Sequence, residues 1–166
     1  LVFCFAGSAV AGTTSYLGDT TGDPTWNRTF GTSGLSGIGT AVPYEAQAFS
    51  VSLSGNYTIT SAYDQYDGYV HLYASSFDPL DQFTNLMAAD DDYNTLYAAQ
   101  MADVSLASGT DYIIVNSGFS NYDFGADATA ITGPGAIQIG GGCPTVPVPT
   151  SLGLVAVGCL SLLRRR

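Results

Sequence analysis

Apolar and polar residues alternate repeatedly along the middle of the chain. Phe49, Val51 and Leu53 alternate with serines, and after a break at residues 54–56 the alternation resumes over residues 57–60. A period of two is typical of strands with one buried face, and a short break between two such runs predicts a β-hairpin. The 3.6-residue spacing that would indicate helices is not sustained anywhere in this region.

Four further segments extend this strand pattern. One of them is predicted where Ala102, Val104 and Leu106 alternate with polar residues ahead of a Ser108-Gly109 turn. In residues 69–73, Val70 and Leu72 are expected to face the core. The alternate residues Tyr69, His71 and Tyr73 are expected to face the other way. Residues 112–115 are apolar without interruption, which predicts a central strand covered on both faces. Residues 128–132 are the last expected strand, because a Gly-Pro-Gly turn follows them.

Residues 20–44 interrupt the pattern with many glycines, and we expect an edge strand there, followed by a loop that crosses the sandwich. At least six short strands with turn residues about every ten positions predict an all-β fold. The expected architecture is an antiparallel β-sandwich, jelly-roll-like, in a single domain over residues 12–142. A chain of 166 residues holds one such core but not two.

The charged residues are few and unevenly placed. All fourteen Asp and Glu residues lie between Asp19 and Asp127, whereas three of the four arginines end the chain and lysine is absent. Arg28 is therefore the only basic residue of the predicted domain. So acidic a surface repels phosphate backbones, which excludes nucleic-acid binding. Of the three cysteines, only Cys143 lies outside the apolar end segments, so no disulfide framework is expected.

The first eleven residues have the features of a signal peptide. The apolar run closes with Ala9-Val10-Ala11, the small-x-small pattern that signal peptidase accepts, and polar residues follow from Gly12. No basic segment precedes the run, so residues 1–11 are expected to be a signal peptide truncated at its start. The alternative is a first buried strand. The signal interpretation predicts cleavage after Ala11, with the export machinery as a partner.

The other end of the chain has three parts. A proline-rich approach stays extended, because proline fixes φ and the residue before it avoids helix. The apolar segment 152–163 is shorter than the ~20 residues that span a bilayer, but such a helix can dock transiently in the inner membrane with the arginines on the cytoplasmic side. The alternative is a C-terminal core helix. The motif residues are Val146, Pro147, Val148 and Pro149, followed by Arg164, Arg165 and Arg166.

This arrangement resembles the PEP-CTERM sorting tail of Gram-negative bacteria, in which Val-Pro-Glu-Pro, an apolar helix and an arginine cluster follow one another. Val148 stands where that family usually has Glu. The resemblance implies a Pro/Gly linker at residues 143–150 and a hydrophobic sorting helix at residues 151–166, processed by an exosortase-type enzyme. It also implies a final location at the cell surface, often in organisms that make exopolysaccharide.

A second resemblance covers most of the predicted domain. The order of its short motifs is similar in outline to bacterial pre-peptidase C-terminal domains, which are β-sandwich modules. That resemblance implies an accessory module that binds or spaces and performs no chemistry. The motifs include Trp26-Asn27-Arg28, Gly55-Asn56-Tyr57-Thr58, Ser76-Phe77-Asp78-Pro79 and Gly109-Thr110-Asp111-Tyr112.

The densest group of candidate ligands is acidic. Carboxylate oxygens at strand ends suit Ca²⁺, and carboxylates gathered without a basic residue favour a cation between them. The spacing differs from the EF-hand loop, which needs Gly and a terminal Glu at fixed positions, and the alternative is a solvated acidic loop. The predicted calcium ligands are Asp64, Asp67, Asp90, Asp91 and Asp92.

Residues for catalysis are not apparent. His71 is the only histidine, the chain lacks a Gly-x-Ser-x-Gly elbow, and nothing singles out a pair of carboxylates for glycoside hydrolysis. We therefore expect no enzymatic activity. Tyrosines are abundant, and those that are exposed are candidates for a carbohydrate-contacting surface. They are Tyr63, Tyr66, Tyr69, Tyr73, Tyr93, Tyr97 and Tyr122.

Together these features predict an exported, non-catalytic protein of the bacterial cell surface or extracellular matrix, sorted by its C-terminal tag, with a body that binds Ca²⁺. The alternatives are a lectin-like carbohydrate-binding module of an exopolysaccharide matrix and, more distantly, a glycan hydrolase. The expected partners are the export machinery, an exosortase-type enzyme and exopolysaccharide, with transient anchoring in the inner membrane.

Overall fold

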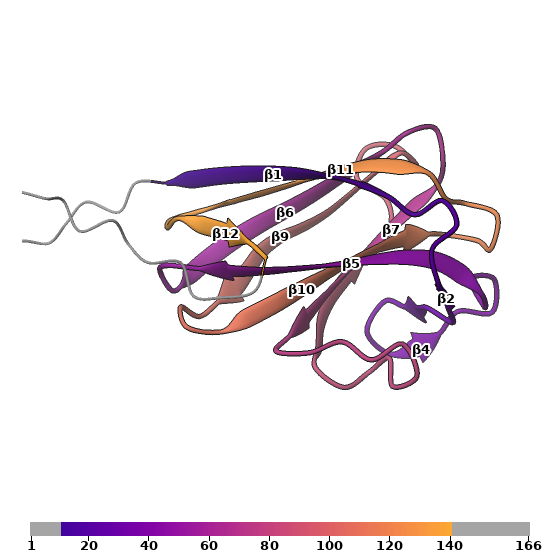
Figure 1. The fold of residues 1–166 in the computed structure, drawn as a ribbon, viewed down its shortest axis with the longest axis horizontal. Helices are drawn as coiled ribbons and strands as arrows, with labels where there is room; N and C mark the ends of the chain where they lie inside the picture. The colour runs from indigo at the N-terminus through magenta and orange to yellow at the C-terminus, as the bar shows by residue number, and fades with distance from the viewer. Residues whose placement is uncertain (1–10, 141–166) are drawn as a thin grey trace, which may run out of the picture.

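The computed structural model describes residues 11–140, which form two antiparallel β-sheets packed face to face (Figure 1). The four-stranded sheet has the order β1 (Gly12–Asp19), β11 (Ala126–Gly133), β6 (Gly55–Tyr63), β9 (Ala98–Leu106). The second sheet has the order β12 (Ile137–Ile139), β5 (Val42–Val51), β10 (Asp111–Gly118), β7 (Gly68–Ala74), β8 (Leu86–Asp90), and β2 (Thr25–Trp26) also pairs with β5. A separate ribbon pairs β3 (Thr29–Phe30) with β4 (Gly34–Leu35).

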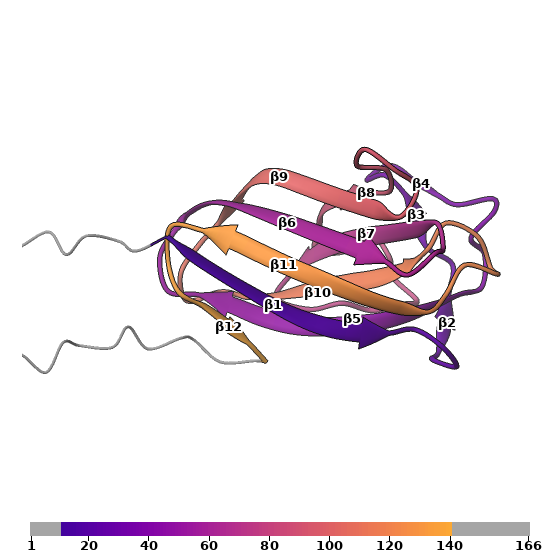
Figure 2. The same cartoon turned by 90° about the horizontal axis from the view of Figure 1, so that it is seen from above.

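Successive strands of the sandwich mostly alternate between the two sheets. Of the strands that are consecutive in sequence, only β7 and β8 are neighbours within one of the two large sheets. The run from β2 through the β3–β4 ribbon returns to the same sheet at β5, and the other connections cross the sandwich (Figure 2). The winding is jelly-roll-like. The predicted all-β, antiparallel sandwich is therefore confirmed. The C-terminal helix expected at residues 151–166, and the signal peptide, linker and sorting motif, lie outside the described residues.

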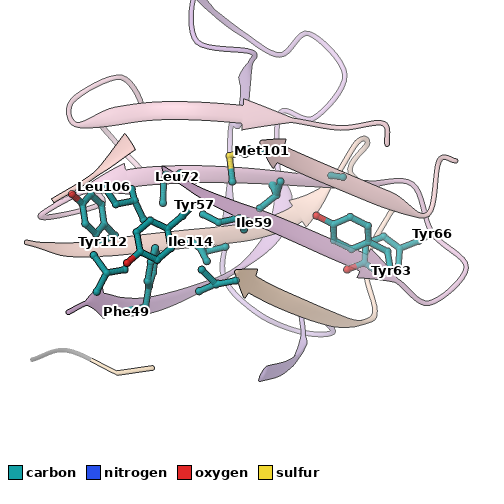
Figure 3. Close-up of a cluster of buried hydrophobic side chains, with 14 residues drawn as sticks. Phe49, Tyr57, Ile59, Tyr63, Tyr66, Leu72, Met101, Leu106, Tyr112 and Ile114 are labelled. Atoms are coloured by element: carbon teal, nitrogen blue, oxygen red, sulfur yellow. The ribbon is translucent and has the colours of Figure 1, made fainter. Parts of the chain in front are cut away.

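The main core fills the space between the sheets. Strand alternation places Val70 and Leu72 of β7 in this core, as predicted, together with Ile59 of β6 and Ile114 of β10. Figure 3 shows that Tyr63 and Tyr66 lie together at one end of the cluster, whereas Phe49, Leu106 and Tyr112 lie at the other end.

A second, smaller core covers the outer face of the six-stranded sheet. The segment between β1 and β5 crosses this face and packs Trp26 against Val42, Tyr73 and Val115. Phe77, from the β7–β8 connection, packs edge-on against Trp26 at 5.1 Å. Strand β10 is thus buried on both faces, which confirms the prediction for residues 112–115, and the crossing of residues 20–44 is also confirmed.

The predicted hairpin around residues 54–56 is wrong. Strands β5 and β6 belong to different sheets, and residues 52–54 form a corner between them, with Leu53 at 42% exposure. Val51 and Ile59 both lie in the main core but on different sheets, so their strands are not paired by hydrogen bonds. Alternation marks which residues are buried, but it does not distinguish paired strands from strands that face each other.

Five strands were not predicted: β3 and β4 lie where a loop was expected, and β1, β8 and β12 lie at the edges of the two large sheets. Strand β1 is mostly Gly, Thr and Ser with an exposed Leu17, strand β8 is short, and β12 follows the Gly-Pro-Gly turn that was expected to end the sheet. Edge strands need less apolar surface, and their sequence signal is correspondingly weak.

The two ends of the sandwich differ in what they carry. The connections at residues 20–24, 64–67, 91–97 and 119–125 lie at one end, which we call the loop end (Figures 1 and 2). The start of β1, strand β12 and the corner at residues 52–54 lie toward the opposite end. Within residues 11–140, no helix has the length and hydropathy needed to cross a membrane.

Candidate functional site

Several carboxylates gather at the loop end. Asp67 is half-buried in the β6–β7 connection, where its backbone carbonyl accepts a hydrogen bond from the N–H of Phe119 at 2.9 Å. Burial, followed by the negative charges of Asp92, Asp123 and Asp91, raises the pKa of Asp67 to about 6. The β6–β7, β8–β9 and β10–β11 connections therefore bring acidic side chains from separate parts of the sequence close together.

The predicted calcium ligands are only partly brought together. Asp67, Asp91 and Asp92 belong to the group at the loop end. Asp90 Oδ2 accepts a hydrogen bond from the N–H of Gln100 at 2.8 Å, and Asp64 lies with Ala62 and Ala126 in a shallow hollow over β6 and β11. Within residues 11–140, no group of three or more His, Cys, Asp or Glu side chains has the geometry to hold a metal ion. Calcium binding at these five acids remains a prediction.

Arg28 is fully buried behind this acidic group, on the outer face of the six-stranded sheet. Its Nε and Nη2 donate to the carbonyl oxygen of Phe119 at 3.1 and 2.6 Å, and its Nη1 donates to that of Thr29 at 2.9 Å. The guanidinium carbon lies 4.1 Å from the centre of the Tyr69 ring and 4.8 Å from that of Phe119. Carbonyl groups and aromatic faces thus hold this cation in place.

His71 lies in the same cluster and is also fully buried. Its ring stacks on Tyr69 at 4.8 Å and meets the edge of Trp26 at 4.9 Å. Burial lowers the pKa of His71 to about 3, so the imidazole is neutral at physiological pH. We call Arg28, His71, Tyr69 and Trp26 the outer aromatic cluster.

A second polar assembly lies between the sheets, close to the loop end, and we call it the carboxylate chamber. It consists of Tyr16 and Gly18 of β1, Glu45 of β5, Tyr66 of the β6–β7 connection and Asp127 of β11. Burial, followed by the charges of Glu45 and Asp19, raises the pKa of Asp127 to about 7. Burial and the Asp127 charge also raise the pKa of Tyr66.

One wall of the chamber is a buried hydrogen-bond network. Asn116 Nδ2 donates to Asp127 Oδ1 at 3.0 Å and to Thr129 Oγ1 at 2.9 Å. Ser61 Oγ donates to Asn116 Oδ1 at 2.9 Å, and the Tyr63 hydroxyl donates to the same oxygen at 3.3 Å. The network fixes one oxygen of Asp127 and leaves the other directed elsewhere.

Our sequence interpretation missed the chamber, although a signal for it exists. Asp127 lies two and four residues before the buried Thr129 and Ile131, and Glu45 lies four residues before the buried Phe49. Because strand side chains alternate, both acids are expected on the inner face. Two inward carboxylates on a strand pattern are informative, because acidic residues are rarely buried without a partner.

The predicted tyrosine surface divides into two groups. Tyr63, Tyr66, Tyr69 and Tyr73 are buried at 0–6% exposure, which excludes them from contact with a carbohydrate. The β8–β9 and β10–β11 connections leave three tyrosines and one phenylalanine accessible at the loop end. Their exposed fractions are 40% for Tyr93, 50% for Tyr97, 90% for Tyr122 and 44% for Phe124.

Comparison with known proteins does not show a family for this chain. No protein-family model matches the chain, and no curated protein matches it. Among solved structures, the K3 cleaved adhesin domain of Lys-gingipain from Porphyromonas gingivalis W83 is similar at 15% identity and a TM-score of 0.36, over 75% of this chain and 91% of that domain.

Proposed function

We propose that this chain is an exported, non-catalytic protein of the bacterial cell surface or extracellular matrix, directed there by its C-terminal tag. The observation that carries the proposal is the sequence Val146-Pro147-Val148-Pro149, followed by an apolar segment and three arginines. Positive charge directly after an apolar helix favours retention of that end on the cytoplasmic side of the inner membrane. An exosortase-type enzyme is the expected partner that reads and processes the tag.

The burial of the titratable groups supports a non-catalytic role. A general acid or base must approach the proton that it transfers to within about 2.6–3.2 Å. His71 is fully buried, and Asp127, whose raised pKa would suit an acid catalyst, is 5% exposed. Neither of these two side chains is therefore accessible to a polysaccharide.

The orientation of the sandwich also suits presentation at a surface. Strand β12, which precedes the tag in sequence, lies toward the end opposite the loop end, as does the start of β1. The loop end therefore faces away from the side of the body that leads to the tag. A surface module needs its accessible loops on that far side.

Mass spectrometry of the protein recovered from cells tests this proposal. We expect the wild-type chain to lose its C-terminal segment in cells that contain an exosortase-type enzyme and to keep it in cells that lack the enzyme. In a variant with Arg164, Arg165 and Arg166 changed to alanine, processing should fall because the charged end is lost. The control is Asp92→Asn, which changes an exposed charged residue outside the tag and should leave processing unchanged. An intact C-terminus on secreted wild-type protein in the presence of the enzyme would overturn the proposal.

Carbohydrate binding is a second candidate function, favoured by the exposed aromatic residues of the loop end. Aromatic side chains that are accessible and rigidly held by short loops provide stacking surfaces for sugar rings. Calorimetric titration with exopolysaccharide should give heat that Tyr122→Ala reduces. The control is Leu80→Ala, because Leu80 is equally exposed at 90% but lies on the β7–β8 connection. Equal heat from both variants and the wild type would exclude the loop end as the binding surface.

A further inference from the structure

Two carboxylates converge over Gly18 inside the carboxylate chamber. A Cβ at Gly18 would overlap Glu45 Oε2 and would lie 2.9 Å from Asp127 Oδ2 and 3.0 Å from Asp127 Oδ1. The carboxylate oxygens of Glu45 and Asp127 therefore converge beside the Gly18 backbone, an approach that any side chain at residue 18 would block. The backbone N–H of Asp19 donates to Glu45 Oε2 at 3.0 Å and fixes that carboxylate in place.

A buried carboxylate oxygen without a partner lies at the same place. Asp127 Oδ2 is buried and has no hydrogen-bond partner among the described residues, whereas the nearby hydroxyl groups of Tyr16 and Tyr66 lie within reach of Thr129 and Thr20. Asp127 and Tyr66 are only 5% and 6% exposed. The Asp127 charge is the strongest electrostatic influence on Tyr66 after burial, so the two groups lie close together. Buried polar atoms are almost always satisfied in folded proteins, so the unpartnered Asp127 oxygen indicates a ligand.

No side chain of the described region supplies the positive charge that the chamber needs. Arg28 is the only basic residue within residues 11–140, and its guanidinium is bonded to the carbonyl groups of Phe119 and Thr29 in the outer aromatic cluster. Two carboxylates held together in a buried site repel each other unless a proton or a metal cation is shared between them.

We propose that the carboxylate chamber is a Ca²⁺ site, with Asp127 and Glu45 as its carboxylate ligands. Its donors are all oxygen atoms, which suits a hard cation, and Ca²⁺ tolerates the irregular geometry that Mg²⁺ does not. Two carboxylates leave further coordination positions to water, which Ca²⁺ accepts as a ligand. The site is separate from the acids of the loop end, and it goes beyond the proposed function, which does not depend on it.

Thermal unfolding of the full chain at neutral pH, with Ca²⁺ or with a chelator, tests the site. Ligand binding to the native state should raise the Tm of the wild type by about 5–10 °C at Ca²⁺ concentrations about 100-fold above Kd. The variants Asp127→Asn and Glu45→Gln should lose this shift. The matched control is the double variant Asp91→Asn/Asp92→Asn, which removes the same kind of charge at the loop end and should keep the shift.

Each other result overturns the proposal. The site does not exist if Ca²⁺ leaves the wild-type Tm unchanged, or if both chamber variants respond as the wild type does. Loss of the shift in the loop-end double variant alone would place the cation at the acids predicted from sequence. Should Asp127→Asn fail to fold, Glu45→Gln decides the question, because Glu45 is only half-buried and lies outside the Asn116 network.

Discussion

The outer aromatic cluster and the carboxylate chamber both bury charge, but they treat it differently. In the outer cluster, the Arg28 guanidinium donates its hydrogen bonds to backbone carbonyl oxygens. The nitrogen atoms without a partner there belong to the neutral rings of Trp26 and His71. In the chamber, an unpartnered oxygen belongs to an ionisable carboxyl group, that of Asp127. The difference teaches that a satisfied buried charge fastens a fold, whereas an unsatisfied one indicates a site for a ligand.

The largest effect expected is from Arg28→Ala. The substitution leaves the carbonyl groups of Phe119 and Thr29 without donors and removes the cation between the two aromatic rings, so the free energy of unfolding should fall by about 3 kcal/mol or more. Urea denaturation measures the loss. The conservative control Arg28→Lys should recover only part of it, because an ammonium group lacks the planar fork. A loss below about 1 kcal/mol would show that the cluster does not fasten the crossing segment.

Asp127→Asn should instead raise the free energy of unfolding when divalent cations are absent. The folded-state pKa of Asp127, about 7, lies above the ordinary value of 3.8, so the wild type loses stability as the pH rises through this range. The amide cannot ionise, and at pH 8 with a chelator the variant should be more stable by about 2 kcal/mol.

The same denaturation experiment at pH 4 provides the internal control, because the carboxyl group is protonated there and the advantage should disappear. Asp92→Asn, which removes an exposed carboxylate, should give little change at either pH. A variant that is less stable than the wild type at pH 8 would contradict the chamber as a site of unpaired charge.

His71 should make stability depend on pH in the reverse direction. Its folded-state pKa of about 3 lies below the ordinary value of 6.5, so protons favour the unfolded chain, and stability is lost as the pH falls below 6.5. Between pH 6.5 and 5 the loss should be about 1.5 kcal/mol. Comparing Asp127→Asn with Asp127→Asn/His71→Gln isolates this contribution, since the opposing carboxyl group is absent from both. Equal pH dependence of the two variants would show that His71 is not buried as a neutral ring.

The smallest effect expected is from Tyr69→Phe. The ring that stacks on Arg28 and His71 remains, and only the hydroxyl that accepts a hydrogen bond from the N–H of Gly31 at 2.8 Å is lost. The cost should be about 1 kcal/mol by urea denaturation. Tyr122→Phe is the control, because that hydroxyl is on a side chain that is 90% exposed. A cost as large as that of Arg28→Ala would mean that the ribbon of β3 and β4, and not the cation, fastens the segment.

The sequence was sufficient for the class of fold and for strands with strong alternation. Val70 and Leu72 are buried as expected, and the unbroken apolar run at residues 112–115 lies between two cores. The same argument from alternation could not predict which strands are hydrogen-bonded to each other. Ile59 and Val51 are both inward-facing, but nothing in their local sequence says that β5 and β6 belong to opposite sheets, because that depends on partners far along the chain.

The candidate sites were harder to predict than the fold. Local clustering drew attention to Asp90, Asp91 and Asp92, which are adjacent in sequence, whereas Glu45 and Asp127 come together only through the packing of the two sheets. Gly18 shows the same limitation, since its importance lies in two carboxylates that approach it from other strands. Sequence proximity therefore found the exposed acids and overlooked the buried ones.

The pairing of the first strand with a late one has a consequence for how the protein acquires its structure. Gly12 pairs with Gly133, and the whole of β1 is held by β11. The four-stranded sheet therefore cannot close until nearly all of the body has been synthesised, and folds dominated by such distant pairings form slowly. In the export that we propose, the chain would have to remain unfolded in transit, and this winding order would delay closure of the sheet before transit.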